Sequence, residues 1–232
     1  MVISNWFFNV SRIECLKGDK TIIERRALKL ERGYLVVFEG IDGTGKSTHC
    51  RMLAEYLESK GFSTICLSEP THGVWGKKIR KILVEGRNGI SPEEELALFI
   101  NDRKEDVTLN ITPALEQKKV VLIDRYYYST AAYQGALGLD PEKICRENEV
   151  FAPKPDRVFI FKASPAQCLE RIRKSRVEGP NTFEKLEYLT KVQNIFDQFS
   201  GAQVRRIDTE PALNVVYAQL CREIDELFGV AN

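Results

Sequence analysis

The sequence lacks several patterns that define common classes of protein. It contains no apolar run of the roughly 18 residues that a membrane-spanning helix requires. Its six cysteines include no C-x-x-C pair, which argues against a zinc site and against thioredoxin-like chemistry. A formal net charge of only +1 gives no overall field that would attract nucleic acid or an acidic membrane. Since the opening residues lack a basic leader and a small-residue cleavage site, we expect a cytoplasmic protein.

What is present suits one compact domain. Hydrophobic residues make up 43% and charged residues 29% of the chain, which is typical of a globular protein. Short apolar runs alternate with helical patterns, and such runs are buried on both faces in parallel sheets. The predicted strands are Leu35–Phe38, Thr64–Leu67, Val120–Ile123, Val158–Phe161 and Val204–Ile207. We therefore expect an α/β fold, a doubly wound parallel β-sheet of about five strands with helices on both faces.

Two segments depart from this alternation. Residues 171–185 are basic and contain Gly179-Pro180, so we expect a mobile lid between two helices. Residues 1–33 precede the first predicted strand, and Lys17–Lys20 separates two short stretches in the manner of a β-hairpin. The plainer alternatives are a solvated basic helix face for 171–185 and a loosely ordered leader for 1–33.

The strongest motif is the complete G-x-x-x-x-G-K-S sequence of residues 40–47. It follows a predicted strand and opens a predicted helix, which is the context that a P-loop requires. Backbone N–H groups of the glycines converge on phosphate oxygens there, and the helix N-terminus adds positive potential. Lys46 is expected to reach the β- and γ-phosphates of ATP, and Ser47 to hold Mg²⁺. The predicted ATP-binding residues are Gly40, Ile41, Asp42, Gly43, Thr44, Gly45, Lys46, Ser47 and Thr48.

The residues after the third predicted strand favour a kinase over other P-loop proteins. Asp124 ends that strand and can support Mg²⁺, directly or through water. The next residue is Arg125 rather than the glutamate with which many ATPases orient water, and no N-K-x-D sequence suggests guanine recognition. The alternative for Asp124 and Arg125 is a structural ion pair at a strand end. We therefore divide the chain into an extension, 1–33, and a P-loop nucleotide kinase domain, 34–232.

Arginines gather where a phosphorylated acceptor would need them. Arg125 follows the carboxyl end of a strand, where ligands bind in open α/β sheets, and Arg80 and Arg103 lie on predicted helices. Two unit negative charges about 4 Å apart cost roughly 4 kcal/mol at an effective dielectric near 20, and arginines offset that repulsion. Closure of the lid would add further cations around the transferred group, so Arg171, Arg173 and Arg176 are predicted to be catalytic.

These motifs, in this order, resemble the thymidylate kinase family from about Tyr34 to the C-terminus. The resemblance implies that Asp42 lies near the 3′-hydroxyl of the acceptor and near the reacting phosphates. It also implies that Glu69-Pro70 and Arg80 belong to the acceptor site. Phe99 and Arg103, four residues apart on one predicted helix face, match a stacking aromatic and an arginine that reads the thymine edge. For Phe99 the plainer alternative is core packing.

The Asp124-Arg125-Tyr126 sequence resembles the family's D-R-Y signature, whose arginine clamps the acceptor phosphate. By the same resemblance Thr130 and Gln134 would face the base, and Tyr133 would lie against the sugar. Because the P-loop carries Gly43 and Thr44 instead of an arginine, the lid arginines would act, as in bacterial members. The family further implies ATP and dTMP as substrates, Mg²⁺ bound with ATP, and a homodimer.

Three features differ from the family pattern. Ser68 stands where many bacterial members have arginine, Thr71-His72 replaces a glycine pair, and residues 1–33 have no counterpart. That extension carries seven basic and four acidic residues, too small an excess to predict DNA binding. Two other functions therefore stay open beside a dTMP kinase. One is a kinase for another nucleoside monophosphate or a deoxynucleoside, and the other is a nucleotide-binding regulator with little turnover.

Overall fold

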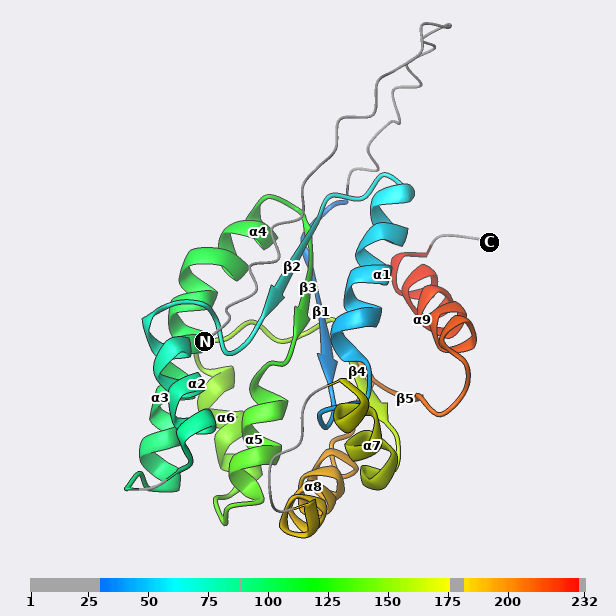
Figure 1. Cartoon of the computed structure of the whole chain (residues 1–232). Coiled ribbons are helices and arrows are strands. Elements are labelled where there is room, and N and C mark those ends of the chain that lie inside the picture. Colours follow the sequence, from blue (N-terminus) through cyan, green and yellow to red (C-terminus); the bar gives the residue numbers. More distant parts are fainter. Residues whose placement is uncertain (1–29, 88, 176–181, 230–232) are drawn as a thin grey trace, which may run out of the picture.

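The computed structural model describes residues 30–87, 89–175 and 182–229. Within these ranges one parallel sheet has the strand order β2-β3-β1-β4-β5 (Figure 1). Its strands are β1 (Tyr34–Glu39), β2 (Thr64–Ser68), β3 (Val120–Asp124), β4 (Arg157–Lys162) and β5 (Val204–Asp208). The five predicted strands are therefore confirmed to within a residue at each end. The predicted hairpin around Lys17–Lys20 lies outside the described residues.

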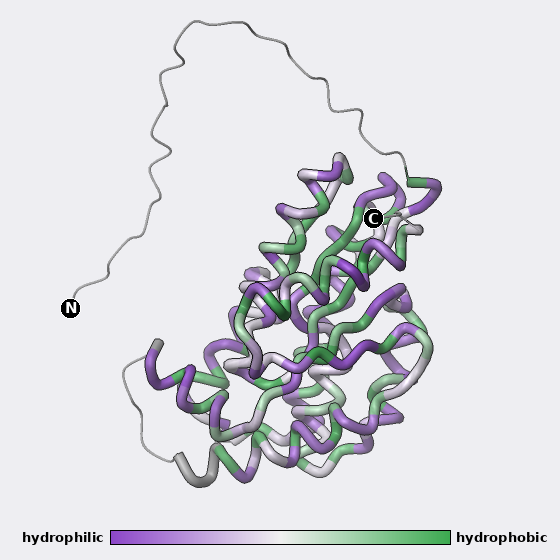
Figure 2. Tube along the Cα trace, turned by 90° about the vertical axis from the view of Figure 1, so that its right-hand side faces the viewer, coloured by the Kyte–Doolittle hydropathy of each residue, from purple (hydrophilic) through white to green (hydrophobic). Residues whose placement is uncertain are grey.

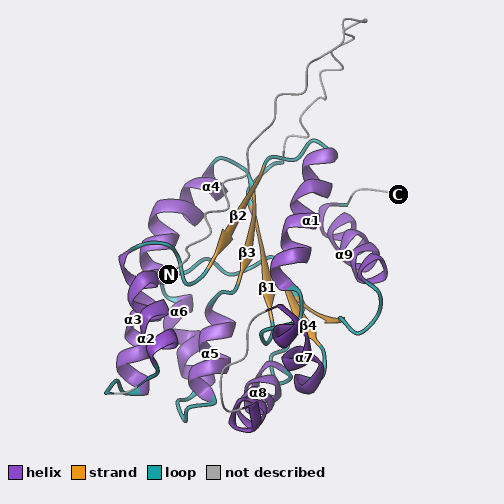
Figure 3. Cartoon of the chain, in the orientation of Figure 1, coloured by secondary structure: helices purple, strands orange, loops and turns teal. Residues whose placement is uncertain are grey.

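Helices cover both faces of this sheet (Figure 3). Helix α1 (Lys46–Ser59) and helix α9 (Leu213–Phe228) lie on one side, and α3 to α6 lie on the other (Figure 1). The remaining elements are α2 (Val74–Glu85), α3 (Pro92–Asp106), the π-helical turn η1 (Val107–Ile111), α4 (Thr112–Glu116), α5 (Tyr127–Gly135), α6 (Pro141–Glu149), α7 (Pro165–Ser175) and α8 (Thr182–Phe196). Among the described residues no helix is long and apolar enough to cross a membrane.

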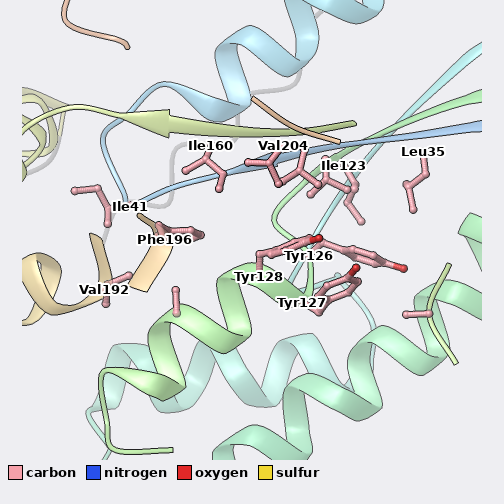
Figure 4. Packing of buried hydrophobic residues seen from close by; sticks show 14 of the residues in the cluster. Leu35, Ile41, Ile123, Tyr126, Tyr127, Tyr128, Ile160, Val192, Phe196 and Val204 are labelled. Atoms are coloured by element: carbon pink, nitrogen blue, oxygen red, sulfur yellow. The ribbon is translucent and has the colours of Figure 1, made fainter. Parts of the chain in front are cut away.

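Alternate residues of each central strand enter two separate cores. On β1, Val36 and Phe38 pack with the apolar residues of α1 and α9, while Leu35 and Val37 face the other side. Figure 4 shows that second core, where Leu35 and Ile123 lie above the rings of Tyr126 and Tyr127. The surrounding helices alternate between polar and apolar residues (Figure 2), because one side of a surface helix packs on the sheet or on a neighbouring helix. Burial on both faces explains why the central strands are continuous apolar runs.

Local signals define where several helices begin. Ser91 Oγ accepts a hydrogen bond from Glu94 N at 3.2 Å, and Glu94 Oε2 accepts one from Ser91 N at 2.8 Å. This reciprocal pair, with Pro92 at the first helical position, is the capping box predicted for α3. Helix α1 begins directly after Gly45, whose φ of 89° lies in the left-handed region.

The parallel sheet places two functional segments at one edge. In the register of β1 and β3, Phe38 pairs with Asp124, so the chain leaves both strands at the same level. The P-loop follows β1, and the turn at Arg125 follows β3. The backbone N–H of Arg125 donates to the carbonyl oxygen of Phe38 at 2.9 Å, and this hydrogen bond links the two turns. Segments about 85 residues apart in sequence therefore meet, as expected for the carboxyl edge of a parallel sheet.

Candidate active site

The P-loop wraps tightly against neighbouring backbone. Gly40 and Gly43 have φ values of 128° and 87°, a region that other residues rarely adopt. A Cβ added to Gly43 would lie 2.5 Å from the carbonyl oxygen of Cys168 on α7. Glycine is therefore required here both for its backbone angle and for the close approach of α7.

Lys46 lies inside the loop that it belongs to. Its side chain is buried, and Nζ donates to the carbonyl oxygen of Ile41 at 2.9 Å. Burial, followed by the positive charge of Arg125, lowers the pKa of the Lys46 ammonium to about 8. An incoming phosphate would oppose that shift, because a nearby anion favours the charged form of lysine. The loop thus holds a cation whose neutralisation by phosphate is favourable.

Ser47 and Asp124, the two residues predicted to hold Mg²⁺, are in direct contact beside the P-loop. The Ser47 hydroxyl donates to Asp124 Oδ2, and the other carboxylate oxygen, Oδ1, is buried without a hydrogen-bond partner among the described residues. A hydroxyl and a carboxylate oxygen are the kind of ligands that Mg²⁺ prefers, with phosphates and water completing its shell. The unpartnered Oδ1 therefore fits a Mg²⁺ ion held directly or through water.

Arg125 joins the P-loop to α5. Its guanidinium donates to Asp42 Oδ1 at 2.7 Å and to Ser129 Oγ at 2.9 Å, and it lies 5.0 Å from the ring centroid of Tyr133. Its backbone has a φ of 73°, an uncommon value for a residue with a side chain. Strain of this kind persists only when surrounding contacts hold it, and it is frequent at functional sites. The structure thus brings together Asp42, Arg125 and Tyr133.

A second cluster forms around Arg103, which is 1% exposed. Its guanidinium pairs with Glu69, donates to Thr130 Oγ1 at 2.9 Å and donates to Asn148 Oδ1 at 2.7 Å. Burial raises the pKa of Glu69 to about 8, against Arg103, which favours the ionised carboxylate. Glu69 Oε1 and Arg103 Nε have no hydrogen-bond partner among the described residues. The cluster joins four segments of the chain, and it contains buried polar atoms without a hydrogen-bond partner among the described residues.

Arg80 and Gln134 form hydrogen bonds with other segments of the candidate site. Arg80 donates to the carbonyl oxygen of Pro70 at 2.8 Å and also to that of Thr71, so its guanidinium lies on the segment after β2. Gln134 is buried, and its Nε2 donates to Glu95 Oε1 at 3.1 Å. Phe99 is partly buried one turn before Arg103 on α3. The structure therefore places Arg80 on the segment after β2 and joins Gln134 to α3.

The predicted lid is partly helical. Arg171 lies within α7 and donates to the carbonyl oxygens of Gly43 at 3.4 Å and Thr209 at 2.8 Å, so its side chain reaches the P-loop backbone. Arg173 follows on the same helix, while Arg176 lies outside the described residues. Helix α7 continues to Ser175, past the predicted start of the lid at residue 171. The mobility of this segment and the catalytic use of its arginines remain predictions.

Sequence reasoning missed four polar residues that organise the site. Asn148 holds Arg103, and Asp102 accepts from Thr71 N at 2.7 Å and from Thr71 Oγ1 at 2.6 Å. Glu95 accepts from Gln134, and Glu39 accepts hydrogen bonds from the start of α5. Nothing in the sequence around Asn148 indicates its role, because its partner lies 45 residues away. Glu39 could have been noticed, since a carboxylate at the buried end of a strand needs donors.

A comparison with known families identifies the chain. The sequence model of one family, described as thymidylate kinase, matches residues 38–220, which is most of the chain. The chain belongs to the thymidylate kinase family. The thymidylate kinase of Desulfotalea psychrophila is 45% identical over 199 residues, covering 86% of this chain and 98% of the relative. That of Akkermansia muciniphila is 44% identical over 197 residues, covering 85% and 94%.

The fold also matches a solved member of this family. The crystal structure of thymidylate kinase from Ehrlichia chaffeensis superposes with a TM-score of 0.67 at 26% identity. The match covers 83% of this chain and 98% of the other. The P-loop fold and the thymidylate kinase resemblance predicted from the sequence are therefore confirmed. The P-loop, Arg103 and Arg125 all lie within the residues that the family model matches.

Proposed function

We propose that the protein phosphorylates dTMP to dTDP by transfer of the γ-phosphoryl group of ATP, a step in the synthesis of dTTP. The observation that carries this proposal is the position of Arg125, bonded to Asp42 in the P-loop and to Ser129 on α5. One guanidinium there is shared between the loop that binds ATP and the helix predicted to bind the acceptor. Such a cation offsets the repulsion between two phosphorylated reactants and positions them for transfer.

The acceptor would occupy the region between Arg125 and the Arg103 cluster. Its phosphate would replace Asp42 on the Arg125 guanidinium and would draw on Arg80. Its base would lie against Phe99, with polar contacts to Arg103, Thr130 and Gln134 and support from Glu69-Pro70. The buried, unpartnered Arg103 Nε and Gln134 Oε1 support this placement, because each has an unused donor or acceptor.

ATP would bind along Gly40–Thr48, with Lys46 leaving the Ile41 carbonyl for phosphate oxygens. Ser47 and Asp124 would hold Mg²⁺, which neutralises phosphate charge when it is bound with the nucleotide. Arg171 already contacts the P-loop backbone, and we propose that it acts on the transferred group together with Arg173 and Arg176. An ionised acceptor phosphate needs no general base, which agrees with a site whose assigned residues are mainly cations.

The test is a coupled assay of ADP release over a panel of acceptors: dTMP, dUMP, UMP, CMP, AMP, GMP and thymidine. We expect dTMP to give the highest kcat/KM. Turnover of UMP, CMP or thymidine equal to that of dTMP would overturn the acceptor assignment. ATP binding without transfer to any acceptor would instead favour a nucleotide-binding regulator.

We also propose a cytoplasmic homodimer, in line with the family resemblance. Sedimentation equilibrium of the full chain over a range of concentrations measures the oligomeric state directly. A mass that stays at one chain, 26.5 kDa, up to high protein concentration would contradict the dimer.

A further inference from the structure

Glu39 is a buried carboxylate with an unusual set of partners. It is the last residue of β1, is fully buried and directly precedes the P-loop. Glu39 Oε1 accepts from Tyr126 N at 2.8 Å and from Ser129 N at 3.2 Å. Glu39 Oε2 accepts from the Ser129 hydroxyl. All of these donors belong to the turn after β3 and the start of α5, more than 80 residues away in sequence.

The carboxylate takes the place of a missing helix cap. Helix α5 begins at Tyr127, and its N-cap residue Tyr126 supplies no side-chain cap. The third N–H of the helix, that of Ser129, is shared between Glu39 Oε1 at 3.2 Å and the carbonyl oxygen of Tyr126 at 3.1 Å. A carboxylate at a helix N-terminus satisfies free N–H groups and is favoured by the helix dipole. A residue of β1 therefore caps the first turn of α5.

Hydrogen bonds from β1 also hold the left-handed backbone conformation of Arg125. The N–H of Arg125 donates to the carbonyl of Phe38, and the N–H of Tyr126 donates to the side chain of Glu39. Two neighbouring residues of β1 thus hold both peptide groups that flank the strained position. Without them, a backbone with a φ of 73° would relax toward a more common conformation.

The Ser129 hydroxyl transmits the effect to the guanidinium. A hydroxyl has one proton to donate, and Ser129 donates it to Glu39. Its lone pairs are then directed at Arg125, whose guanidinium donates to Ser129 Oγ at 2.9 Å. The other arm of that guanidinium pairs with Asp42. Where Glu39 is ionised, the direction of each hydrogen bond in this series follows, because an ionised carboxylate can only accept.

We propose that Glu39 is a positioning residue for Arg125, acting through the Ser129 hydroxyl and the N-terminus of α5. This inference rests on the proposed phosphoryl transfer to dTMP and deepens it. The charged and titratable groups that interact with Glu39 include Arg125 after β3, Lys46 on α1 and Cys145 on α6. Glu39 itself does not contact a reacting atom in this scheme, so its effect appears on the acceptor side.

The decisive variant is Glu39→Gln, which preserves shape while changing an acceptor into a donor. The amide oxygen can still accept the two backbone hydrogen bonds. The amide nitrogen would donate to Ser129 Oγ and compete there with Arg125. We expect kcat to fall by about 10–100-fold and KM for dTMP to rise several-fold, with KM for ATP within about twofold. A structural role alone would lower thermal stability without this acceptor-selective pattern.

Ser129→Ala supplies an independent arm if Glu39→Gln does not fold. It removes the hydroxyl but retains the carboxylate and both backbone hydrogen bonds, so the same acceptor-selective loss is expected at smaller size. In the double variant, Glu39→Gln should cost less than it does in the wild type, because its route through Ser129 is already gone. Glu149→Gln is the matched control, since Glu149 also contacts α5, accepting from Tyr127 Oη at 3.4 Å, and its kinetics should be unchanged.

Three results would overturn the proposal. One is unchanged kcat and KM for dTMP in folded Glu39→Gln or in Ser129→Ala. Another is a loss confined to KM for ATP, which would place the effect of Glu39 on the P-loop. The third is strict additivity of the two substitutions. A wild-type protein that does not phosphorylate dTMP would refute the proposed function itself, and this outcome is distinguishable from the other three.

Discussion

The two halves of the candidate active site are built differently. The ATP side consists of consecutive residues, Gly40–Thr48, whose shape follows from glycine backbone angles and the start of α1. The proposed acceptor side is assembled from the ends of β2 and β3 and from α3, α5 and α6, and its polar groups are buried against each other. On the ATP side the ligand supplies the partners, whereas on the acceptor side the protein supplies most of them. Substitutions should therefore separate the two halves by their effect on stability as well as on activity.

The largest effect is expected on the ATP side. Lys46→Ala should reduce phosphoryl transfer by about 10³-fold or more, because a preorganised cation at the transferred group is lost. The free energy of unfolding should change little, since Lys46 donates only to the Ile41 carbonyl among the described residues. Single-turnover transfer and thermal unfolding measure the two quantities. A strongly destabilised Lys46→Ala protein would contradict the expectation that substitutions on the ATP side affect activity without affecting stability.

Arg125→Ala should come next, with transfer reduced by about 10²–10³-fold. ATP affinity should stay within a few-fold, because we assign the charge of Arg125 to the acceptor phosphate. Isothermal titration with an ATP analogue, in parallel with the ADP-release assay, tests this split. Arg146→Ala, at an exposed pair with Glu142 on α6, is a suitable control. Lost ATP affinity with intact dTMP affinity would contradict the assigned side.

The pH dependence of stability should report the buried carboxylate of Glu39. Burial raises the pKa of Glu39 to about 7, although Ser129 and Arg125 oppose the shift. The folded protein therefore binds this proton more tightly than the unfolded chain, so the contribution of Glu39 to stability falls as pH rises from about 4.5 to 7. The total change is about 3 kcal/mol for an isolated group. Glu39→Gln should flatten the corresponding part of the curve, as measured by urea unfolding at several pH values, and an unaltered slope would contradict this.

Asn148→Ala should lower stability and acceptor binding together. Removal of the amide leaves a buried Arg103 nitrogen unsatisfied, which costs about 1–3 kcal/mol. KM for dTMP should rise several-fold because Arg103 loses one of its three supports, while KM for ATP should not change. Urea unfolding and steady-state kinetics give both numbers. An effect on stability alone would make the Arg103 cluster a purely structural feature.

The smallest effect is expected for Phe99→Ala. Loss of a stacking surface should raise KM for dTMP by about tenfold or less, since an aromatic stacking contact is worth about 1 kcal/mol beyond its burial. ATP binding should be unaffected. Leu109→Ala, at an exposed apolar position on η1, controls for a general loss of apolar surface. An unchanged KM for dTMP would indicate that Phe99 serves only in core packing.

Most of the fold was predictable because its signals are local. Apolar runs indicated all five strands, and the capping box indicated the start of α3 at its correct residue. The end of α3 gave no comparable signal, because the backbone stays in the right-handed helical conformation from α3 through η1 into α4. At the lid, basic residues and Gly179-Pro180 suggested a break from residue 171, but α7 continues to Ser175. Amino-acid composition therefore indicates that such a segment exists but does not define its first and last residues.

The candidate site likewise contains residues that local sequence signals reveal and residues that they do not. The residues of the P-loop and the pair formed by Ser47 and Asp124 could be named from motif spacing and strand order. The partners of Arg103 and the cap that Glu39 provides for α5 could not, because each hydrogen bond joins residues 27 to 90 positions apart. Buried polar groups must find partners, but the sequence does not say which distant group will be within reach.

The sequence by itself determined the parallel sheet, the phosphate-binding loop and the family, because strand periodicity, glycine backbone freedom and helix capping act over a few residues. Only the tertiary structure decided how the acceptor side is held together. The pairing of β1 with β3 brings the ends of the two strands to one level. Each charged group that is buried there must then pair with a donor or acceptor that the fold places within reach.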